Sequence, residues 1–335
     1  MGIKIGNVET RNNVFLAPMS GITDEPFRSI AHEAGAGLVV SEMVASEELV
    51  RERPDMMRRA RGQNKLSPFV MQLAGREAKW MSEGARVAQD MGADIIDINM
   101  GCPARQVTGG LSGSALMRDL DHALTLIEAT VAAAKVPVTL KMRLGWDDKM
   151  LNAPELAKRA EAAGIALITV HGRTRCQFYT GRADWKAIRA VRDVIKIPLI
   201  ANGDGQSAED ARAMMAVSGA DGIMIGRGSY GRPWWPGVIA EQLNQGRGEK
   251  EPRLDLEQKF LMTQHMETLS LYGVVLGNRT FRKHLGWTIS RLLQRNLISQ
   301  ENAEYLRSTL LRENDNQKVK EGIVKLYRDQ LDKAA

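Results

Sequence analysis

Cysteines are scarce in this sequence and long apolar runs are missing, and both features exclude classes of protein. Among 335 residues only Cys102 and Cys176 are cysteines, too few for a disulfide framework or a four-cysteine zinc site. No apolar run approaches the roughly 18 residues of a membrane-spanning helix. The first residues also lack the apolar core of a signal peptide. We therefore expect a cytoplasmic protein without a membrane partner.

Histidines are also few, and their spacing does not indicate a metal centre. The chain has five of them, and His32, His122, His265 and His284 show no His-x-Glu or His-x₃-His pattern. Patterns of this kind bring two or more groups of a zinc site onto one helix. We expect no bound metal and no metal-dependent catalysis.

The composition indicates a folded protein with an anionic partner. Hydrophobic residues make up 44% of the chain, so a large core can form, and the length fits one domain of about 200–250 residues with a smaller one. Lysine and arginine number 46 against 40 aspartates and glutamates, a net charge of +6. A basic balance favours partners such as nucleic acid.

Eight short apolar or β-branched runs alternate with helical patterns along the first part of the chain. Amphipathic helical spacing fills most of the segments between them, including residues 83–91, 123–134, 155–163, 185–194 and 209–217. The runs are Val14–Met19, Leu38–Ser41, Phe69–Leu73, Ile95–Met100, Val138–Arg143, Leu167–His171, Pro198–Asn202 and Gly222–Ile225. This alternation predicts an α/β fold, a (β/α)8 TIM barrel.

A second, helical domain follows the barrel. After Pro233-Trp234-Trp235-Pro236 no strand pattern returns, and the remainder is rich in Leu, Arg, Lys and Glu. We place the boundary near residue 245, with the barrel in residues 1–244 and a small C-terminal all-helical domain in residues 245–335. A doubly wound sheet is the alternative fold. It usually has a glycine fingerprint after its first strand, and residues 17–21 do not form one.

Polar residues or glycines follow almost every predicted strand. Barrels of this kind carry their chemistry at the carboxyl ends of the strands, so these positions are candidates for one site. Glycines after the seventh and eighth strands would let backbone N–H groups approach a phosphate, which favours a phosphorylated cofactor. At a single strand a polar residue merely leaving the core is the simpler explanation, but seven strands share the feature. The candidates are Pro18, Met19, Ser20, Gln72, Asn99, Lys141, Arg143, His171, Asn202, Gly203, Asp204, Gly226 and Arg227.

The two cysteines have different settings. Cys102 follows the fourth strand, between Gly101 and Pro103. A free cysteine is often a buried core residue, but the flanking glycine and proline predict a fixed loop over the barrel mouth and favour a catalytic thiol. Cys176 has no such setting, and we interpret it as incidental.

The helical domain contains a stretch with charge of one sign. Gly273–Gln300 has no acidic residue and holds several arginines and a lysine. At helical spacing, the apolar residues Phe281, Leu285, Ile289 and Leu292 share one face that we expect to pack inward. The basic residues grouped on another face are Arg279, Arg282 and Lys283. They are candidates for contacts with phosphates; the alternative is a helix neutralised by carboxylates from elsewhere in the fold.

Seven segments spread over nearly the whole chain have a family-specific sequence. They are Leu16–Asp24, Ser41–Met43, Asp97–Pro103, His171–Arg175, Ala201–Asp204, Met224–Arg227 and Gly231–Trp234. In these segments the sequence resembles the tRNA-dihydrouridine synthase family, most closely its bacterial B-type branch. The resemblance implies a TIM barrel with FMN at its mouth and a helical domain that helps to hold tRNA.

The implied reaction is the reduction of the C5–C6 bond of specific D-loop uridines in tRNA, with NADPH or NADH as reductant. Cys102 would be the general acid, because a thiol with a pKa of about 8.5 is mostly protonated at neutral pH. Asn99 and Arg143 would contact the uracil, and we expect a monomer. The implied FMN contacts are Pro18, Met19, Ser20, Gln72, Lys141, His171, Asn202, Gly203, Asp204, Gly226 and Arg227.

Two other functions compete with this one. A flavin barrel that acts on a free pyrimidine or another small enone would share the strand-end residues, but it needs no basic helical appendage. An RNA-binding protein that has lost catalysis would keep the barrel, but the presence of Cys102, Lys141 and the glycines argues against it.

Overall fold

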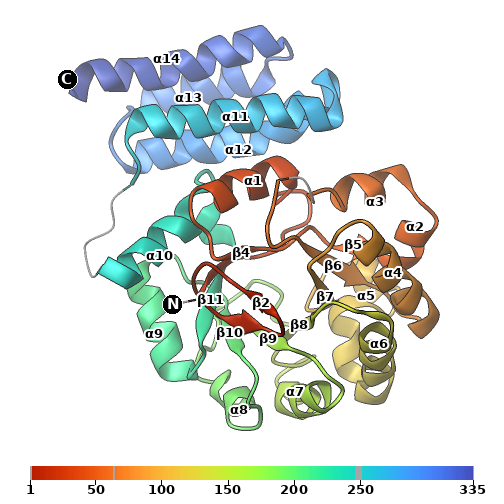
Figure 1. Cartoon of the computed structure of the whole chain (residues 1–335). Coiled ribbons are helices and arrows are strands. Elements are labelled where there is room, and N and C mark those ends of the chain that lie inside the picture. Colours follow the sequence, from red (N-terminus) through yellow and green to blue (C-terminus); the bar gives the residue numbers. More distant parts are fainter. Residues whose placement is uncertain (1, 63–64, 246–250, 335) are drawn as a thin grey trace. The chain divides into compact units, whose positions relative to one another are not determined.

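The computed structural model describes residues 2–62, 65–245 and 251–334 (Figure 1). The chain divides into two compact units: residues 1–228 with 236–249, and residues 229–235 with 250–335. The boundary that we expected near residue 245 adjoins residues 246–250, which lie outside the described residues.

Parallel strands form the inner layer of the first unit, and they follow one another around the sheet in chain order. They are β3 (Val14–Leu16), β4 (Leu38–Val39), β5 (Val44–Ala45), β6 (Val70–Ala74), β7 (Ile95–Met100), β8 (Val138–Arg143), β9 (Leu167–His171), β10 (Leu199–Asn202) and β11 (Gly222–Ile225). Strands buried on both faces require apolar runs such as Ile95–Met100, and every residue of β7 is buried. All eight predicted strand positions are confirmed.

The second strand position differs from the prediction because it is occupied by two short pieces. β4 pairs with β3, and β5 pairs with β6. Between them Val40 forms a parallel bridge with Val70, and the backbone N–H of Ser41 donates to the carbonyl of Val70 over 3.0 Å. These contacts close the ring, so the predicted (β/α)8 barrel is confirmed.

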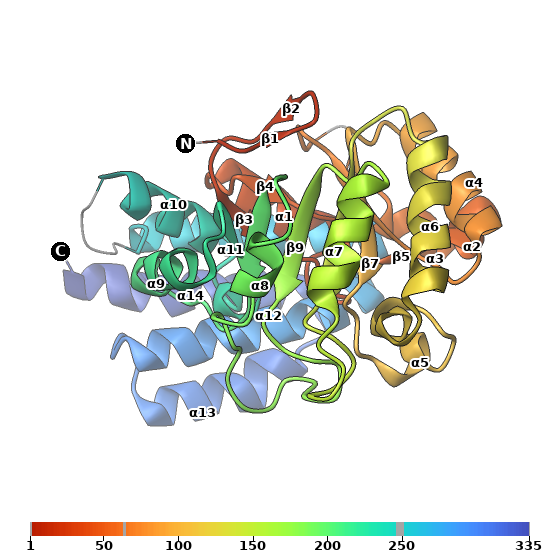
Figure 2. The same cartoon turned by 90° about the horizontal axis from the view of Figure 1, so that it is seen from below.

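Helices form the outer layer of this unit. Figures 1 and 2 show α4, α6, α7 and α9 around the strands. In α4 the buried residues Met81, Gly84, Ala85 and Ala88 share one face, the spacing expected of a helix that covers a sheet. The helices are α1 (Glu25–Glu33), α2 (Ser46–Val50), α3 (Pro54–Arg59), α4 (Ala78–Asp90), α5 (Arg105–Thr108), α6 (Leu120–Ala133), α7 (Ala153–Ala162), α8 (Arg189–Arg192), α9 (Ala208–Ser218) and α10 (Trp235–Gln245), with 3₁₀ turns at Gly113–Arg118 and Arg227–Ser229.

The helix predicted for residues 185–194 is wrong over most of its length, since α8 covers only Arg189–Arg192. Local side-chain bonds hold the first part in turns instead. The indole of Trp185 donates to the carbonyl of Gly203 over 2.7 Å, and the backbone N–H of Ala187 donates to the Asp184 carboxylate over 2.9 Å. Bonds of this kind compete with helix formation.

A small hairpin covers the amino-terminal end of the barrel. It consists of β1 (Lys4–Ile5) and β2 (Val8–Glu9). Ile3 and Ile5 join the buried cluster that contains Leu38, Val70 and Ile95, residues at the starts of strands. Because apolar side chains fill that end, the carboxyl ends of the strands are the place where a site can form.

The second unit is a bundle of α11 (Leu254–Tyr272), α12 (Val274–Gln294), α13 (Gln300–Thr309) and α14 (Asn316–Ala334), with a 3₁₀ turn at Leu310–Arg312. The predicted apolar face of α12 is confirmed, because Phe281, Leu285, Ile289 and Leu292 are buried in one cluster with residues of the other three helices. No helix in the described ranges is long and apolar enough to span a membrane.

Residues 229–235 belong to the helical unit, although we expected them in the barrel. Tyr230 stacks on Trp287 with 4.0 Å between the ring centroids, and Trp234 stacks on Phe260. The carbonyl of Gly231 accepts hydrogen bonds from the hydroxyl of Thr288 and the Nε of Arg291. The aromatic residues after β11 therefore pack against the bundle.

Candidate active site

The register of the barrel strands brings the predicted residues together. Asn99 on β7 is opposite Lys141 on β8, Arg143 is opposite His171 on β9, and His171 is opposite Asn202 on β10. Because the strands are parallel, their carboxyl ends meet at one end of the barrel. Five of the predicted residues thus form one group.

The loop after β7 holds Cys102 by its backbone. The N–H of Cys102 donates to Asn99 Oδ1 over 3.0 Å, and its carbonyl accepts from the hydroxyl and the N–H of Ser114 over 2.8 and 3.1 Å. Arg143 Nε donates to the carbonyl of Gly101 over 2.8 Å. The thiol is half-buried on a fixed loop, whereas Cys176 is exposed.

Lys141 is a half-buried cation at the same end of the barrel. Its Nζ donates to Asn202 Oδ1 over 3.2 Å, and among the described residues no carboxylate lies within ion-pair distance of it. Burial lowers the pKa of Lys141 to about 8, and Arg143 adds to the shift, while Asp97 and Cys102 oppose it. An ammonium in this setting is suited to binding an anion or an electron-rich carbonyl.

Arg143 ties two loops of the barrel mouth together. The residue is 1% exposed. Besides Gly101, its guanidinium donates to the carbonyls of Thr174 and Phe178 over 2.8 and 2.9 Å. Burial lowers its pKa to about 10, so it stays charged at neutral pH.

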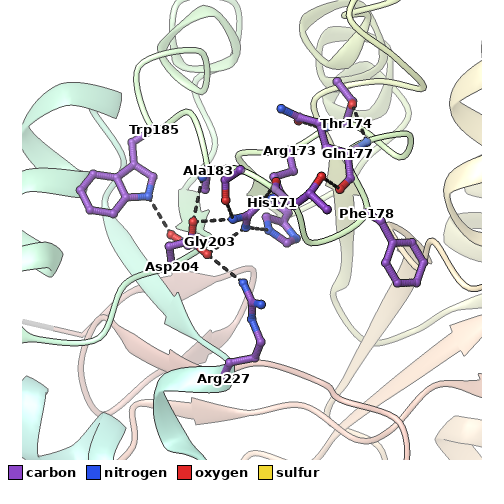
Figure 3. A network of polar contacts seen from close by, with 12 residues as sticks. His171, Arg173, Thr174, Gln177, Phe178, Ala183, Trp185, Gly203, Asp204 and Arg227 are labelled. Carbon is purple, nitrogen blue, oxygen red and sulfur yellow. Dashed lines mark hydrogen bonds and ion pairs between the residues drawn. The ribbon is translucent and has the colours of Figure 1, made fainter.

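Figure 3 shows a polar network at the ends of β9 and β10. Asp204 accepts two hydrogen bonds from Arg173, over 2.6 and 2.9 Å, and one from Arg227 over 2.9 Å. Burial alone would raise the pKa of Asp204, but these arginines and the N–H of Ala183 hold it below its ordinary value. Asp204 thereby orients two cations beside the strand ends.

His171 is neutral at physiological pH in this network. Burial, with Arg143, Lys141 and Arg173 as further causes, lowers its pKa well below the ordinary value. Its Nε2 lies 3.3 Å from Arg173 Nη1. A guanidinium can only donate, so Nε2 accepts and the proton is on Nδ1.

The turn after β10 has an unusual backbone. Gly203 has a φ of 125° and Asp204 a φ of 58°. A Cβ at Gly203 would lie 2.7 Å from the Cβ of Ala183 and 3.0 Å from the ring of His171. Only glycine fits there, which explains the Asn-Gly-Asp sequence at this strand end.

The remaining predicted residues lie at the ends of β3 and β11 and, for Gln72, on β6. Pro18 and Met19 are half-buried and Ser20 is exposed. A Cβ at Gly226 would meet the sulfur of Met19 at 3.6 Å, so the ends of β3 and β11 adjoin. Gln72 is fully buried and bonds to Asp97 and Asn99.

Three residues near the site were missed as site residues in the sequence. Arg173 was recognised only as part of a motif. Tyr179 is 46% exposed. The guanidiniums of Arg143 and Arg227 lie 5.6 and 5.1 Å from the centroid of the Tyr179 ring. Asp97 is buried inside β7. The available signal for Asp97 was a carboxylate in an apolar strand, two residues before Asn99 and therefore on the same face.

These groups fit a phosphorylated flavin. Cations gather at the strand ends: Lys141, Arg143, Arg173 and Arg227 together depress the pKa of His171. Of these, Arg173 and Arg227 are paired with the carboxylate of Asp204. Such a group of cations suits a phosphate and the electron-rich edge of a reduced ring. No group of three His, Cys, Asp or Glu side chains that could hold a metal occurs in the described part of the chain.

Two basic residues at the carboxyl end of α12 are paired with a carboxylate of α11, and the others differ in their exposure and contacts. Arg291 and Arg295 are neutralised by the buried Glu257, through bonds from their guanidiniums over 2.5 and 2.7 Å. For these two arginines, a carboxylate from elsewhere in the fold therefore balances the charge. Arg279 is exposed. Arg282 donates to Asn314 Oδ1 over 2.6 Å.

Solved structures with low sequence identity share the barrel fold. Morphinone reductase matches with a TM-score of 0.52 and 14% identity, over 76% of this chain and 91% of that one. The old yellow enzyme homologue from Zymomonas mobilis matches with a TM-score of 0.51 and 16% identity, over 76% and 95% of the two chains.

The sequence comparisons are far more specific. The family model described as "Dihydrouridine synthase (Dus)" matches residues 15–326. A probable tRNA-dihydrouridine synthase of Rhizobium leguminosarum bv. phaseoli is 58% identical over 284 residues, covering 85% of this chain and 87% of the relative. The tRNA-dihydrouridine synthase B of Pseudomonas putida is 44% identical over 290 residues, covering 86% of each. The chain therefore belongs to the dihydrouridine synthase family.

Proposed function

We propose that this protein reduces the C5–C6 bond of D-loop uridines in tRNA, giving 5,6-dihydrouridine. The observation that carries the proposal is the placement of Cys102 on a fixed loop at a barrel mouth lined with Lys141, Arg143 and His171. Family membership supports the same reaction, since the relatives named above are tRNA-dihydrouridine synthases.

The reaction needs a hydride at C6 of the uracil and a proton at C5. When bound, the flavin supplies the hydride. The thiol of Cys102 would give its proton to C5, where conjugate addition leaves negative charge. The hydrogen bonds to Asn99 and Ser114 would keep the thiol in place for this transfer. Asn99 and Arg143 would contact the uracil.

FMN is the cofactor that we propose. Lys141 would face the ring edge that becomes electron-rich on reduction, because a cation there stabilises the anionic form. His171, Arg227 and the turn at Gly203 would face the phosphate. The Arg173–Asp204 ion pair would hold that turn. The other FMN contacts would come from Pro18, Met19, Ser20, Gln72, Asn202, Asp204 and Gly226.

NADPH or NADH would provide the electrons, and the chain would act as a monomer in the cytoplasm. The barrel, which we assigned to residues 1–244, would bind FMN and the target base. The helical region, residues 245–335, would bind tRNA through Arg279, Arg282 and Lys283. A base stacked in tRNA cannot enter a barrel mouth, so the uridine must be splayed out at a cost of a few kcal/mol.

A direct assay separates this function from the reduction of a small molecule. Purified protein would be incubated with FMN, NADPH and either unmodified tRNA, free uridine or cyclohexenone, and dihydrouridine or NADPH loss would be measured. We expect efficient turnover of tRNA and little of the small substrates. Faster turnover of cyclohexenone or uridine than of tRNA would favour a small-molecule reductase.

A further inference from the structure

Asp97 is a buried carboxylate inside the barrel, and the roles described so far do not use it. It is 4% exposed and lies in the middle of β7, in register with Gln72 on β6 and Thr139 on β8. Gln72 Nε2 donates to its Oδ2 over 2.7 Å, and the hydroxyl of Thr139 donates to its Oδ1 over 2.6 Å. Burying a carboxylate is costly even when it is bonded.

The hydrogen bonds continue from Asp97 to the backbone of Cys102. Gln72 Oε1 accepts from Asn99 Nδ2 over 2.7 Å. Asn99 Oδ1 in turn accepts from the N–H groups of Gly101 and Cys102 over 3.2 and 3.0 Å. Gln72 and Asn99 are 0% and 8% exposed, so water competes little for these bonds. The chain of bonds is continuous through three buried side chains.

The direction of this chain is the same at both ends, because Asp97 accepts and the N–H groups of Gly101 and Cys102 can only donate. Each amide has one donating and one accepting end. Because Oδ2 of Asp97 accepts, the NH₂ group of Gln72 must face it, and the oxygen of Gln72 then faces Asn99. The NH₂ group of Asn99 faces Gln72 for the same reason, which leaves its oxygen for Cys102. Reversing either amide would bring two acceptors or two donors together.

We propose that Asp97 is a positioning residue for the reduction of uridine. It fixes the amide orientations of Gln72 and Asn99, and through them it holds the backbone of Cys102 at the barrel mouth. The proposal rests on the function proposed above, in which Cys102 is the acid. The chain of hydrogen bonds from Asp97 to Cys102 can be tested in the flavin-free protein alone.

The position of Cys102 can be followed by amide hydrogen exchange in the flavin-free protein. The chain has two cysteines, so labelling with [¹⁵N]cysteine gives two amide signals, and Cys176→Ala assigns them. The N–H of Cys176 donates to the carbonyl of Trp146 over 2.8 Å and serves as an internal reference.

Asp97→Val removes the acceptor that faces Gln72. We expect the Cys102 amide to exchange about tenfold faster, the equivalent of one hydrogen bond, and the Cys176 amide to be unchanged. Asp97→Asn can keep an oxygen toward Gln72 and its NH₂ group toward Thr139, so exchange should stay within about threefold of the parent. The control Asp94→Asn alters a carboxylate that accepts from the N–H of Phe69 at the other end of the barrel.

An unchanged Cys102 exchange rate in Asp97→Val, with faster exchange in Asn99→Ala, would overturn the proposal. Should Asp97→Val fail to fold, Gln72→Met interrupts the same chain of bonds one step later. It is expected to give the same acceleration, and an unchanged rate would again overturn the proposal.

Catalysis provides the second readout. In Asp97→Val, kcat for tRNA should fall about tenfold while KM for tRNA stays within about twofold, because an acid out of place affects the chemical step. Asp97→Asn should restore most of kcat. If no tRNA is reduced even by the parent, the proposed function fails while the exchange result still stands. Equal exchange rates with normal parent activity would refute the role of Asp97 alone.

Discussion

Cys102 and Cys176 differ in their backbone contacts and exposure, which makes Cys102 the better candidate for a catalytic thiol. The backbone of Cys102 is bonded on both sides, to Asn99 and to Ser114. Cys176 is exposed, in a loop where its N–H bonds to Trp146. A proton donor must be held within reach of the reacting carbon, and the bonds of the loop after β7 would hold the thiol of Cys102 for that role.

Replacing Cys102 by alanine should slow uridine reduction by roughly 10²- to 10⁴-fold, the usual contribution of a positioned acid. Flavin binding and oxidation of NADPH should change little, because neither step uses the thiol. Single-turnover reduction of tRNA by pre-reduced enzyme measures the effect. Cys176→Ala is the matched control, and equal rates for both variants would assign the proton to another group.

Lys141 should make flavin binding depend on pH. Burial lowers its pKa to about 8, so its positive charge is lost as the pH rises through 8. We expect FMN affinity to fall above pH 8 in the parent and to be weak and nearly pH-independent in Lys141→Met. Fluorescence titrations of FMN between pH 6 and pH 10 test this, and a parent affinity without a pH dependence would contradict the role of Lys141.

The same pKa shift affects the stability of the flavin-free protein. The pKa of Lys141 is about 8 when folded and 10.5 when unfolded, so between these values the unfolded chain binds more protons. The free energy of unfolding should therefore rise as pH increases through this window, by at most about 3 kcal/mol. Urea unfolding should show a smaller rise in Lys141→Met. The same rise in both proteins would place the titrating group elsewhere.

At the scale of strands and helices, the sequence predicted the barrel well because parallel strands are buried on both faces and read as apolar runs. It predicted the strand-end residues for the same reason, since the residue after each run is at the mouth. Asp97 escaped attention because it lies inside a run. The bonds of Trp185 and Asp184, which shorten α8, depend on contacts that helical periodicity does not contain.

The turn after β10 offers a test of this local structure. Gly203→Ala should lower the free energy of unfolding by about 2–3 kcal/mol and weaken FMN binding, because the new Cβ would meet Ala183 and His171 in a backbone region nearly restricted to glycine. Gly181 also has a positive φ, 65°, but no atom lies within 4 Å of a Cβ placed there.

Gly181→Ala is therefore the control for backbone strain alone, and it should cost about 1 kcal/mol. Denaturant unfolding and FMN titration of the two variants would be compared. Equal losses of stability and affinity would show that the close contacts at Gly203 are unimportant.

Arg279 and Lys283 on α12 provide a second element-scale prediction. Arg279→Ala/Lys283→Ala should weaken tRNA binding and reduce the slope of log affinity against log salt by about 0.7–0.9 per lost phosphate contact. Reduction of the flavin by NADPH should be unaffected. Lys318→Ala/Lys325→Ala on α14 removes the same charge as a control. Equal affinities and slopes in parent and α12 variant would mean that these residues do not contact tRNA.

At the scale of the whole molecule, the sequence separated a barrel from a helical region but could not place residues 229–235. These residues come shortly after β11, and their stacking on Trp287 and Phe260 depends on residues far along the chain. Likewise, the sequence showed that Gly273–Gln300 has no acidic residue, but it could not show which of its arginines are neutralised. The carboxylate of Glu257, which neutralises Arg291 and Arg295, comes from another helix.

Mapping dihydrouridine in tRNA from cells with and without this gene tests the proposed function most directly. We expect D-loop dihydrouridine to disappear from at least one position without the gene. The parent gene should restore it, and a gene carrying Cys102→Ala should not. Identical dihydrouridine maps with and without the gene, in cells that have no second enzyme of this family, would show that this protein does not reduce tRNA uridines.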